Sequence, residues 1–187
     1  GNAASPYITD DQMLYQPPIK TVTWFHTGAF LDRERILSQF KEEYFPNWFE
    51  GQRPDERNVL GDFRENDLPE PDLDAAGLSS EEWREALRAC KGMMLRQEVY
   101  ELDVDAQMAG EGHPLKLFST AYHNSHIRRL QPRGANCYAV FLVTESEAIT
   151  YNYELDLRSE TLTPDPRVAH TLNLNVDEYG NVLQSIA

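Results

Sequence analysis

The sequence predicts an α+β fold that is predominantly antiparallel β, with two helices in the N-terminal half and long strands and hairpins in the C-terminal half. Apolar side chains recur with the helical period over residues 32–44 and 79–94. They recur with a period of two over residues 149–157 and 168–176, as expected of half-buried strands. The glycine-bearing turn at residues 177–181 then predicts a terminal hairpin.

The N-terminal elements follow from short local signals. Residues 1–20 are polar and contain prolines, and we interpret them as an extended lead-in whose first five residues are compatible with a tag remnant. Residues 21–25 are β-branched and aromatic, which predicts a strand. The stripe over residues 32–44 predicts the first helix, which Pro46 prevents from extending further.

A long acidic loop is expected over residues 46–78, because this stretch has no periodicity and is rich in acids and proline. The second helix follows, and Ser79 with Glu82 has the spacing of a capping box. Cys90 lies on its apolar stripe, which predicts a small buried residue. These elements and the first strand form a predicted region over residues 21–110.

The remainder, residues 111–187, is predicted to be an antiparallel β module that continues beyond Ala187. A turn region is expected at residues 106–114, and one or two strands at residues 115–130. The apolar run at residues 138–143 predicts a strand buried on both faces. Its five-residue core is far too short to span a bilayer.

Composition excludes several classes of function. The 187 residues include 31 Asp and Glu against 17 Lys and Arg, a net charge of −14. Phosphate recognition needs a surplus of basic side chains, so nucleic acid and anionic membrane surfaces are not expected as partners. Cys90 and Cys137 are the only cysteines, so neither a disulfide framework nor a four-thiolate zinc site is available.

The five histidines do not form a metal motif. His123 and His126 have a spacing that binds metal on a helix, but in a strand these positions face opposite sides. We therefore expect them to be exposed or hydrogen-bonded. His26 is interpreted as a turn residue or polar anchor, His113 as a loop residue, and His170, on the apolar register of its strand, as a core histidine.

One enzymatic alternative has a specific pattern. Arginine-specific ADP-ribosyltransferases use an Arg, then Ser-Thr-Ser, then Glu-x-Glu, and the chain offers Arg96, Ser119-Thr120 and Glu145 with Glu147 in that order. The third serine is replaced by alanine. The two glutamates also fit a solvated turn between two strands, which is the structural interpretation we favour.

Five separated blocks together resemble the middle region of B subunits of insecticidal toxin complexes, a family that includes the SpvB-like virulence proteins. The resemblance covers about residues 21–187. The blocks are TWFHTGAF, LRACKGMMLRQEVYELD, IRRLQPRGANCYAVF, AITYNYE and DPRVAHTLNLNVDEYGNVLQS.

The resemblance implies a structural segment of a secreted toxin-complex B-type subunit, without catalytic residues, cofactor or metal. In this family a β-propeller docks on the pore-forming A subunit, and a shell of rearrangement-hotspot (Rhs, YD-type) repeats is completed by a C subunit. The expected function is to form part of the β shell that encapsulates and helps deliver a cytotoxic polypeptide. An independent binding or adhesion β module remains a further alternative.

Overall fold

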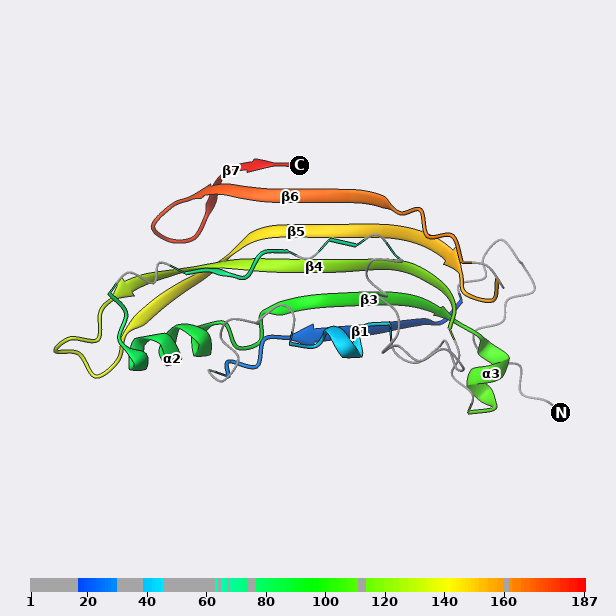
Figure 1. Ribbon diagram of the computed structural model, residues 1–187, viewed down its shortest axis with the longest axis horizontal. Helices are drawn as coiled ribbons and strands as arrows, with labels where there is room; N and C mark the ends of the chain where they lie inside the picture. Colours follow the sequence, from blue (N-terminus) through cyan, green and yellow to red (C-terminus); the bar gives the residue numbers. More distant parts are fainter. Residues whose placement is uncertain are drawn as a thin grey trace.

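A single twisted sheet organises the computed structural model, which describes residues 17–29, 39–45, 63, 65–66, 68–73, 77–110, 114–159 and 162–187. The sheet has seven strands in the order β1-β3-β4-β5-β6-β7, with β2 beside β4 (Figure 1). Its strands are β1 (Ile19–Phe25), β2 (Asp72–Leu73), β3 (Met94–Leu102), β4 (Pro114–Gln131), β5 (Val140–Asp156), β6 (Arg167–Val176) and β7 (Val182–Ile186). All neighbours are antiparallel except β2 and β4, which confirms the predominantly antiparallel β class.

Strands β4 and β5 form the long centre of the sheet. The predicted segment 115–130 is one continuous strand of 18 residues. The predicted turn at Glu145 and Glu147 is wrong, because β5 continues through both residues for 17 residues. A β-bulge absorbs the irregularity: Glu147 opposes Asn124 and Glu145 opposes Ser125, so Ser146 is the extra residue.

The expected burial of residues 138–143 on both faces is also wrong. Tyr138 is 70% exposed and Val140 is 46% exposed. This end of the β4–β5 hairpin projects beyond the rest of the sheet (Figure 1), so only part of its apolar surface meets other elements.

Helix α2 (Ser80–Ala89) confirms the predicted helix start. The Ser79 hydroxyl accepts from the Glu82 N–H at 3.2 Å, and the Glu82 carboxylate accepts from the Ser79 N–H at 2.9 Å, which is a complete capping box. The predicted continuation to Met94 is wrong, because Gly92 takes a φ of 88° and turns the chain directly into β3.

The prediction of two helices in the N-terminal half is not supported. Residues 32–38 of the first predicted helix lie outside the described residues, and the following part contains a single 3-10 turn, η2 (Lys41–Glu43). A short α3 (Val104–Met108) instead overlaps the predicted turn region, and the Asp103 carboxylate accepts from the N–H of Asp105 at its start. No helix among the described residues is long and apolar enough to cross a membrane.

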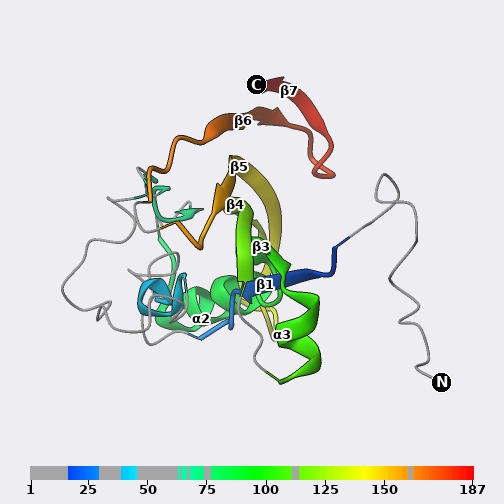
Figure 2. The ribbon, with the colours of Figure 1, turned by 90° about the vertical axis from the view of Figure 1, so that its right-hand side faces the viewer.

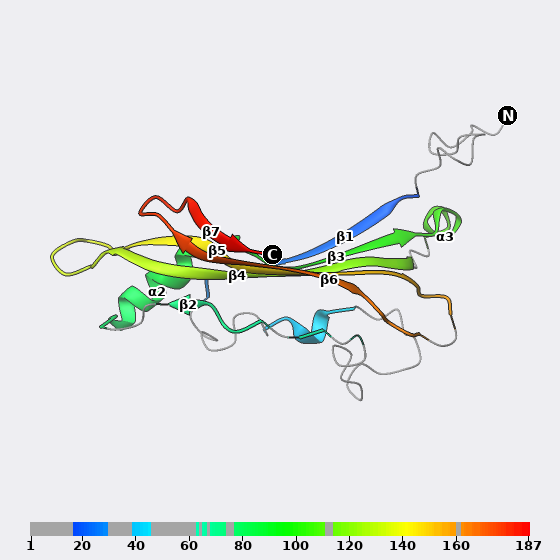
Figure 3. The ribbon, with the colours of Figure 1, turned by 90° about the horizontal axis from the view of Figure 1, so that it is seen from above.

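One face of the sheet is covered and the other is left open by the described residues. Figure 3 shows α2, β2 and η2 on the same side of the sheet. The main core lies beneath them and includes Ile149, Tyr151 and Tyr153, the apolar register predicted for β5. We call the described parts of residues 39–73 the covering segment.

The core does not extend to β6, where the predicted half-burial is wrong. Val168 and Leu174, on its apolar register, are 54% and 51% exposed. His170 is exposed rather than a core histidine, with 42% of its side chain accessible. Figure 2 shows the reason: β6 and β7 lie beyond β5, away from α2.

The predicted terminal hairpin is confirmed. The Asp177 carboxylate accepts from the N–H groups of Tyr179 and Asn181, each at 2.8 Å. Gly180 has a φ of 92°, the left-handed backbone that only glycine adopts readily. Strand β7 then pairs with β6 from Val182 to Ile186.

Candidate functional site

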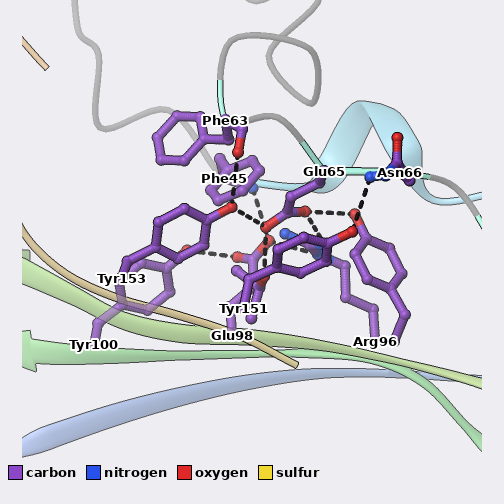
Figure 4. Close-up of polar contacts among 11 residues, drawn as sticks. Phe45, Phe63, Glu65, Asn66, Arg96, Glu98, Tyr100, Tyr151 and Tyr153 are labelled. Atoms are coloured by element: carbon purple, nitrogen blue, oxygen red, sulfur yellow. Dashed lines mark hydrogen bonds and ion pairs between the residues drawn. The ribbon is translucent and has the colours of Figure 1, made fainter. Parts of the chain in front are cut away.

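The most concentrated group of polar side chains surrounds Arg96 on the covered face of the sheet. Arg96 lies on β3 and its guanidinium is fully buried. Its Nη1 donates to Glu65 of the covering segment at 2.7 Å, and its Nε donates to Glu98 of the same strand at 2.9 Å. One buried cation therefore holds two buried carboxylates (Figure 4).

Glu65 is the centre of this cluster. Besides Arg96, its carboxylate accepts from the hydroxyls of Tyr122 at 2.6 Å, Tyr153 at 2.7 Å and Thr120. Together with Arg96 these donors come from three strands, β3, β4 and β5, and Figure 4 shows tyrosine side chains of the sheet pointing toward Glu65. Charge-assisted hydrogen bonds of this kind are about twice as strong as neutral ones.

Glu98 is bound by a second set of donors. The Tyr100 hydroxyl donates to it at 2.6 Å and the Phe45 N–H at 3.0 Å. Burial raises the pKa of Glu98 above its ordinary value, although the charge of Arg96 acts in the opposite direction. Phe45 has a φ of 52°, a conformation unusual for a bulky residue, and this hydrogen bond helps to hold it.

Aromatic rings enclose the guanidinium. The Arg96 Cζ lies 4.3 Å from the ring centroid of Tyr122, 4.5 Å from that of Tyr44 and 4.8 Å from that of Phe45. Burial by itself favours a neutral guanidine, but the charges of Glu65 and Glu98 outweigh it and raise the pKa of Arg96. The Arg96 side chain therefore stays positively charged inside the fold.

The Arg96 cluster has the properties of a buried structural contact rather than of a ligand-binding site. Arg96 and Glu98 are 0% exposed and Glu65 is 7% exposed, so solvent and solutes do not reach the charges. Burial also raises the pKa values of Tyr100 and Tyr122, so neither phenol is poised to give up its proton. What the cluster does is join the covering segment to β3, β4 and β5.

The residues of the ADP-ribosyltransferase pattern are not brought together. Arg96 is enclosed by its own carboxylates, and Thr120 binds Glu65. Ser119 lies on the opposite face of β4 from Thr120, as alternation along a strand requires. A dinucleotide phosphate therefore has no access to the arginine.

The two glutamates of that pattern point to different faces. The bulge at Ser146 sets Glu145 opposite Ser125 of β4, and the Glu145 carboxylate contacts His123 Nδ1 at 2.6 Å. Glu147 instead faces the covered side and contacts His170 Nε2 at 2.7 Å. An open carboxylate pair on one face, which the Glu-x-Glu chemistry needs, is absent from this part of the described chain.

The remaining histidines have structural contacts. His26 is buried, and its Nδ1 accepts from the Gly28 N–H at 2.8 Å, so it is the polar turn residue that the sequence predicts. Burial lowers its pKa. His126 lies 3.9 Å from Asp72, and His113 lies outside the described residues. The described residues contain no group of His, Cys, Asp and Glu that could hold a metal ion.

Cys90 confirms its predicted role as a small buried residue. It is 1% exposed and packs with Ala86 and Ile127. Burial raises the pKa of its thiol to about 12, which keeps it uncharged and unreactive. Cys137 is exposed in the β4–β5 hairpin.

Fold and cluster together define a module of antiparallel sheet whose main polar cluster is closed to solvent. Residues 85–187, more than half of the chain, match the family described as the insecticide toxin TcdB middle/C-terminal region. The chain belongs to this family, and it is a middle region of a TcdB-type subunit of an insecticidal toxin complex. No curated protein matches it.

Solved structures show the same fold. The crystal structure of TcdB2-TccC3 aligns with 90% of this chain at 22% identity and a TM-score of 0.57. A TcdB2-TccC3 structure without the hypervariable C-terminal region aligns with 90% at 24% identity and a TM-score of 0.55. A Tc holotoxin pore of Photorhabdus luminescens aligns with 90% at 21% identity and a TM-score of 0.51. The chain spans only 7% of the length of each of these structures.

Proposed function

We propose that the chain is a structural segment of a toxin-complex B-type subunit and forms part of the β shell that encapsulates and helps deliver a cytotoxic polypeptide. The mechanism is containment: paired strands close a wall, and the wall separates the cargo from proteases and solvent until delivery. The family and the fold shared with TcdB2-TccC3 support this proposal. The partners would be C-type and A-type subunits of a secreted complex.

The exposed β6–β7 hairpin is the observation that carries the proposal. All five residues of β7 are exposed, and Val182, Leu183 and Ile186 are apolar. Among the described residues no strand pairs with the outer edge of β7. An apolar strand edge of this kind promotes aggregation unless further structure covers it, and a continuous wall supplies such cover.

The Arg96 cluster supports the same role from the other side of the molecule. It fastens the covering segment to three strands without offering a reactive or accessible group. A wall segment needs rigidity of this kind, whereas a catalytic cluster needs access to substrate.

Protease protection of the cargo tests the proposal. The full-length parent protein is co-expressed with its C-type partner, and the protected fragment is compared between the wild type and Leu183→Lys. We expect Leu183→Lys to expose the cargo to protease. Under the proposal further protein covers β7, so the lysine charge would be buried against that protein and would weaken the contact that closes the wall. The matched control is Arg167→Gln, at an exposed position of the neighbouring strand β6, which should leave protection unchanged. Equal protection in the wild type and Leu183→Lys would contradict a wall at this edge.

A further inference from the structure

The loop that follows β1, residues 26–29, is joined to the end of α2 through His26; we call it the His26 loop. The His26 N–H donates to the Met93 carbonyl at 2.8 Å, and the His26 carbonyl accepts from the Gly92 N–H at 2.9 Å. Both partners lie in the turn between α2 and β3, beside the end of β1 (Figure 1). Along the chain the His26 loop precedes the covering segment, so these contacts fix where the path to that segment begins.

The His26 ring is buried in its neutral form. Its Nδ1 accepts from the Gly28 N–H at 2.8 Å, so the ring proton lies on Nε2. His26 is 3% exposed, and its Nε2 has no hydrogen-bond partner among the described residues. A second proton would have to sit on Nδ1, where it would face the Gly28 N–H donor and leave both groups without an acceptor.

The His26 loop packs closely on the end of α2. Gly28 has a φ of 76°, and a Cβ at this position would lie 3.1 Å from the Lys91 Cβ and 3.4 Å from the Arg88 Cα. The loop therefore cannot move further toward α2 to accommodate a charged ring. Relief of an unfavourable contact at His26 requires the loop to move away from α2.

The charged groups of the surrounding elements do not favour a cation at His26. Arg88 and Lys91, at the end of α2, are themselves cationic. The first charged side chain of β3 is Arg96, whose two carboxylates are already paired with it, and Glu43 of the covering segment accepts from an indole N–H of β1. Neither ring nitrogen of His26 contacts a carboxylate among the described residues. In agreement, burial lowers the pKa of His26.

We propose that His26 makes this contact sensitive to acid: when the ring takes up a second proton, the His26 loop separates from the end of α2. In the open loop, water solvates the charged ring and the Gly28 N–H, which the closed loop cannot do. Because the closed loop resists the second proton, it is fully favoured above the ordinary histidine pKa of about 6.5 and becomes less favoured as the pH falls below that value. The proposal does not depend on the shell role, since every group lies on this chain.

Amide hydrogen exchange of the isotope-labelled chain between about pH 7.5 and pH 5 tests the proposal. The Gly28 and Gly92 N–H groups report on the loop, because both bond to His26. After correction for the intrinsic exchange rate, we expect their opening constants to rise about tenfold for each pH unit below about pH 6.5. The central amides of β4 and β5 should not follow this dependence. Opening constants of Gly28 and Gly92 that stay level over the whole range would overturn the proposal.

His26→Asn is the matched variant. An Asn side chain accepts readily from the N–H two residues further along, so it replaces the Nδ1 acceptor without a titrating group. The opening constants of Gly28 and Gly92 should then be independent of pH. His170→Asn, on β6 and away from α2, should keep the pH dependence of the wild type. A dependence that persists in His26→Asn would assign it to another group and overturn the proposal.

The ring nitrogen resonances of the wild type give a second measurement that needs no variant. At about pH 7.5 we expect the His26 proton on Nε2, as the Gly28 hydrogen bond requires. On acidification, the second proton should be gained together with the opening of the Gly28 amide. A neutral ring with its proton on Nδ1, or a ring that becomes charged while the loop stays closed, would contradict the proposal.

Discussion

At the scale of single residues, the molecule depends on a buried cation with two carboxylates. A buried ion pair is not in itself strong support for a fold, because removing both charges from water costs several kcal/mol for each ion. Here the cost is offset by hydrogen bonds from tyrosine, threonine and backbone donors, and by three aromatic rings around Arg96. Loss of Arg96 would leave two buried carboxylates without a cation, although each would keep hydrogen bonds from other donors.

Replacement of Arg96 by methionine should destabilise the chain by about 3–5 kcal/mol, because Glu65 and Glu98 would remain buried without a cation. Urea unfolding followed by circular dichroism measures the change. Arg167→Gln is the control, since that arginine is 78% exposed and its pair with Glu154 is open to solvent. Equal stability of Arg96→Met and the wild type would show that the cluster does not hold the fold.

The same cluster predicts a loss of stability at alkaline pH. Burial raises the folded-state pKa values of Tyr100, Tyr122 and Tyr153 above the ordinary value of 10. The folded chain therefore keeps three protons that the unfolded chain releases above that pH. Stability is complete below about pH 10 and then falls by up to about 4 kcal/mol per pH unit, at about 1.4 kcal/mol for each phenol.

Urea unfolding between about pH 9 and pH 11 measures this dependence. In Tyr122→Phe two of the three phenols remain, so the slope above about pH 10 should fall by about a third. A stability that stays level across this range would contradict the assignment of three buried, protonated phenols.

The roles of some residues could be predicted from the sequence, and those of others could not. Cys90 and Gly180 were predictable because a helical stripe and a turn pattern are local signals. Arg96 stood out only as part of an enzymatic pattern that the structure does not assemble. Glu65 gave no signal at all, since it lies in an aperiodic acidic stretch and its partners are 31 to 88 positions away along the chain.

At the scale of elements, local patterns predicted starts better than ends. The capping box fixed the beginning of α2, and a β-branched and aromatic run located β1. Alternation together with a glycine turn located the β6–β7 hairpin. The continuity of β5 was missed because acids at Glu145 and Glu147 look like a turn, whereas a bulge at Ser146 allows both to stay in the strand. The exposure of β6 was missed because alternation shows which side chains share a face, but not whether anything covers that face.

The β6–β7 hairpin gives a prediction at this scale. Gly180→Val should destabilise the hairpin by more than about 1 kcal/mol, since a side chain there is strained at positive φ. Its Cβ would also lie 3.2 Å from the Thr144 methyl group. Hydrogen exchange should accelerate in β6 and β7 and stay unchanged in β3 and β4. Gly77→Ala is the control, because Gly77 also has a positive φ but has open space around it. Its loss of stability measures the backbone strain alone, and a larger loss in Gly180→Val measures the added steric clash.

Uniform acceleration across the whole sheet in Gly180→Val would contradict an independently opening hairpin. Unchanged exchange in β6 and β7 would contradict the tight turn itself. Either result would change the interpretation of the exposed edge, because that interpretation treats the hairpin as a separable part of the sheet.

At the scale of the whole molecule, the chain is one section of sheet with a closed polar cluster on its covered face and exposed apolar residues on β6 and β7. The proposed wall would give these features a common explanation, and the chain shares its family and its fold with the proteins from which the proposal starts. The net charge of −14 argues against nucleic acid as a partner.

The structure of the full-length parent protein bound to its C-type partner, determined by electron cryomicroscopy, is the most direct test of the proposed wall. We expect the outer edge of β7 to pair with or be covered by further protein, and one face of this sheet to border an enclosed cavity. A sheet that lies outside the enclosure, with the β7 edge and its apolar side chains in open solvent, would contradict it.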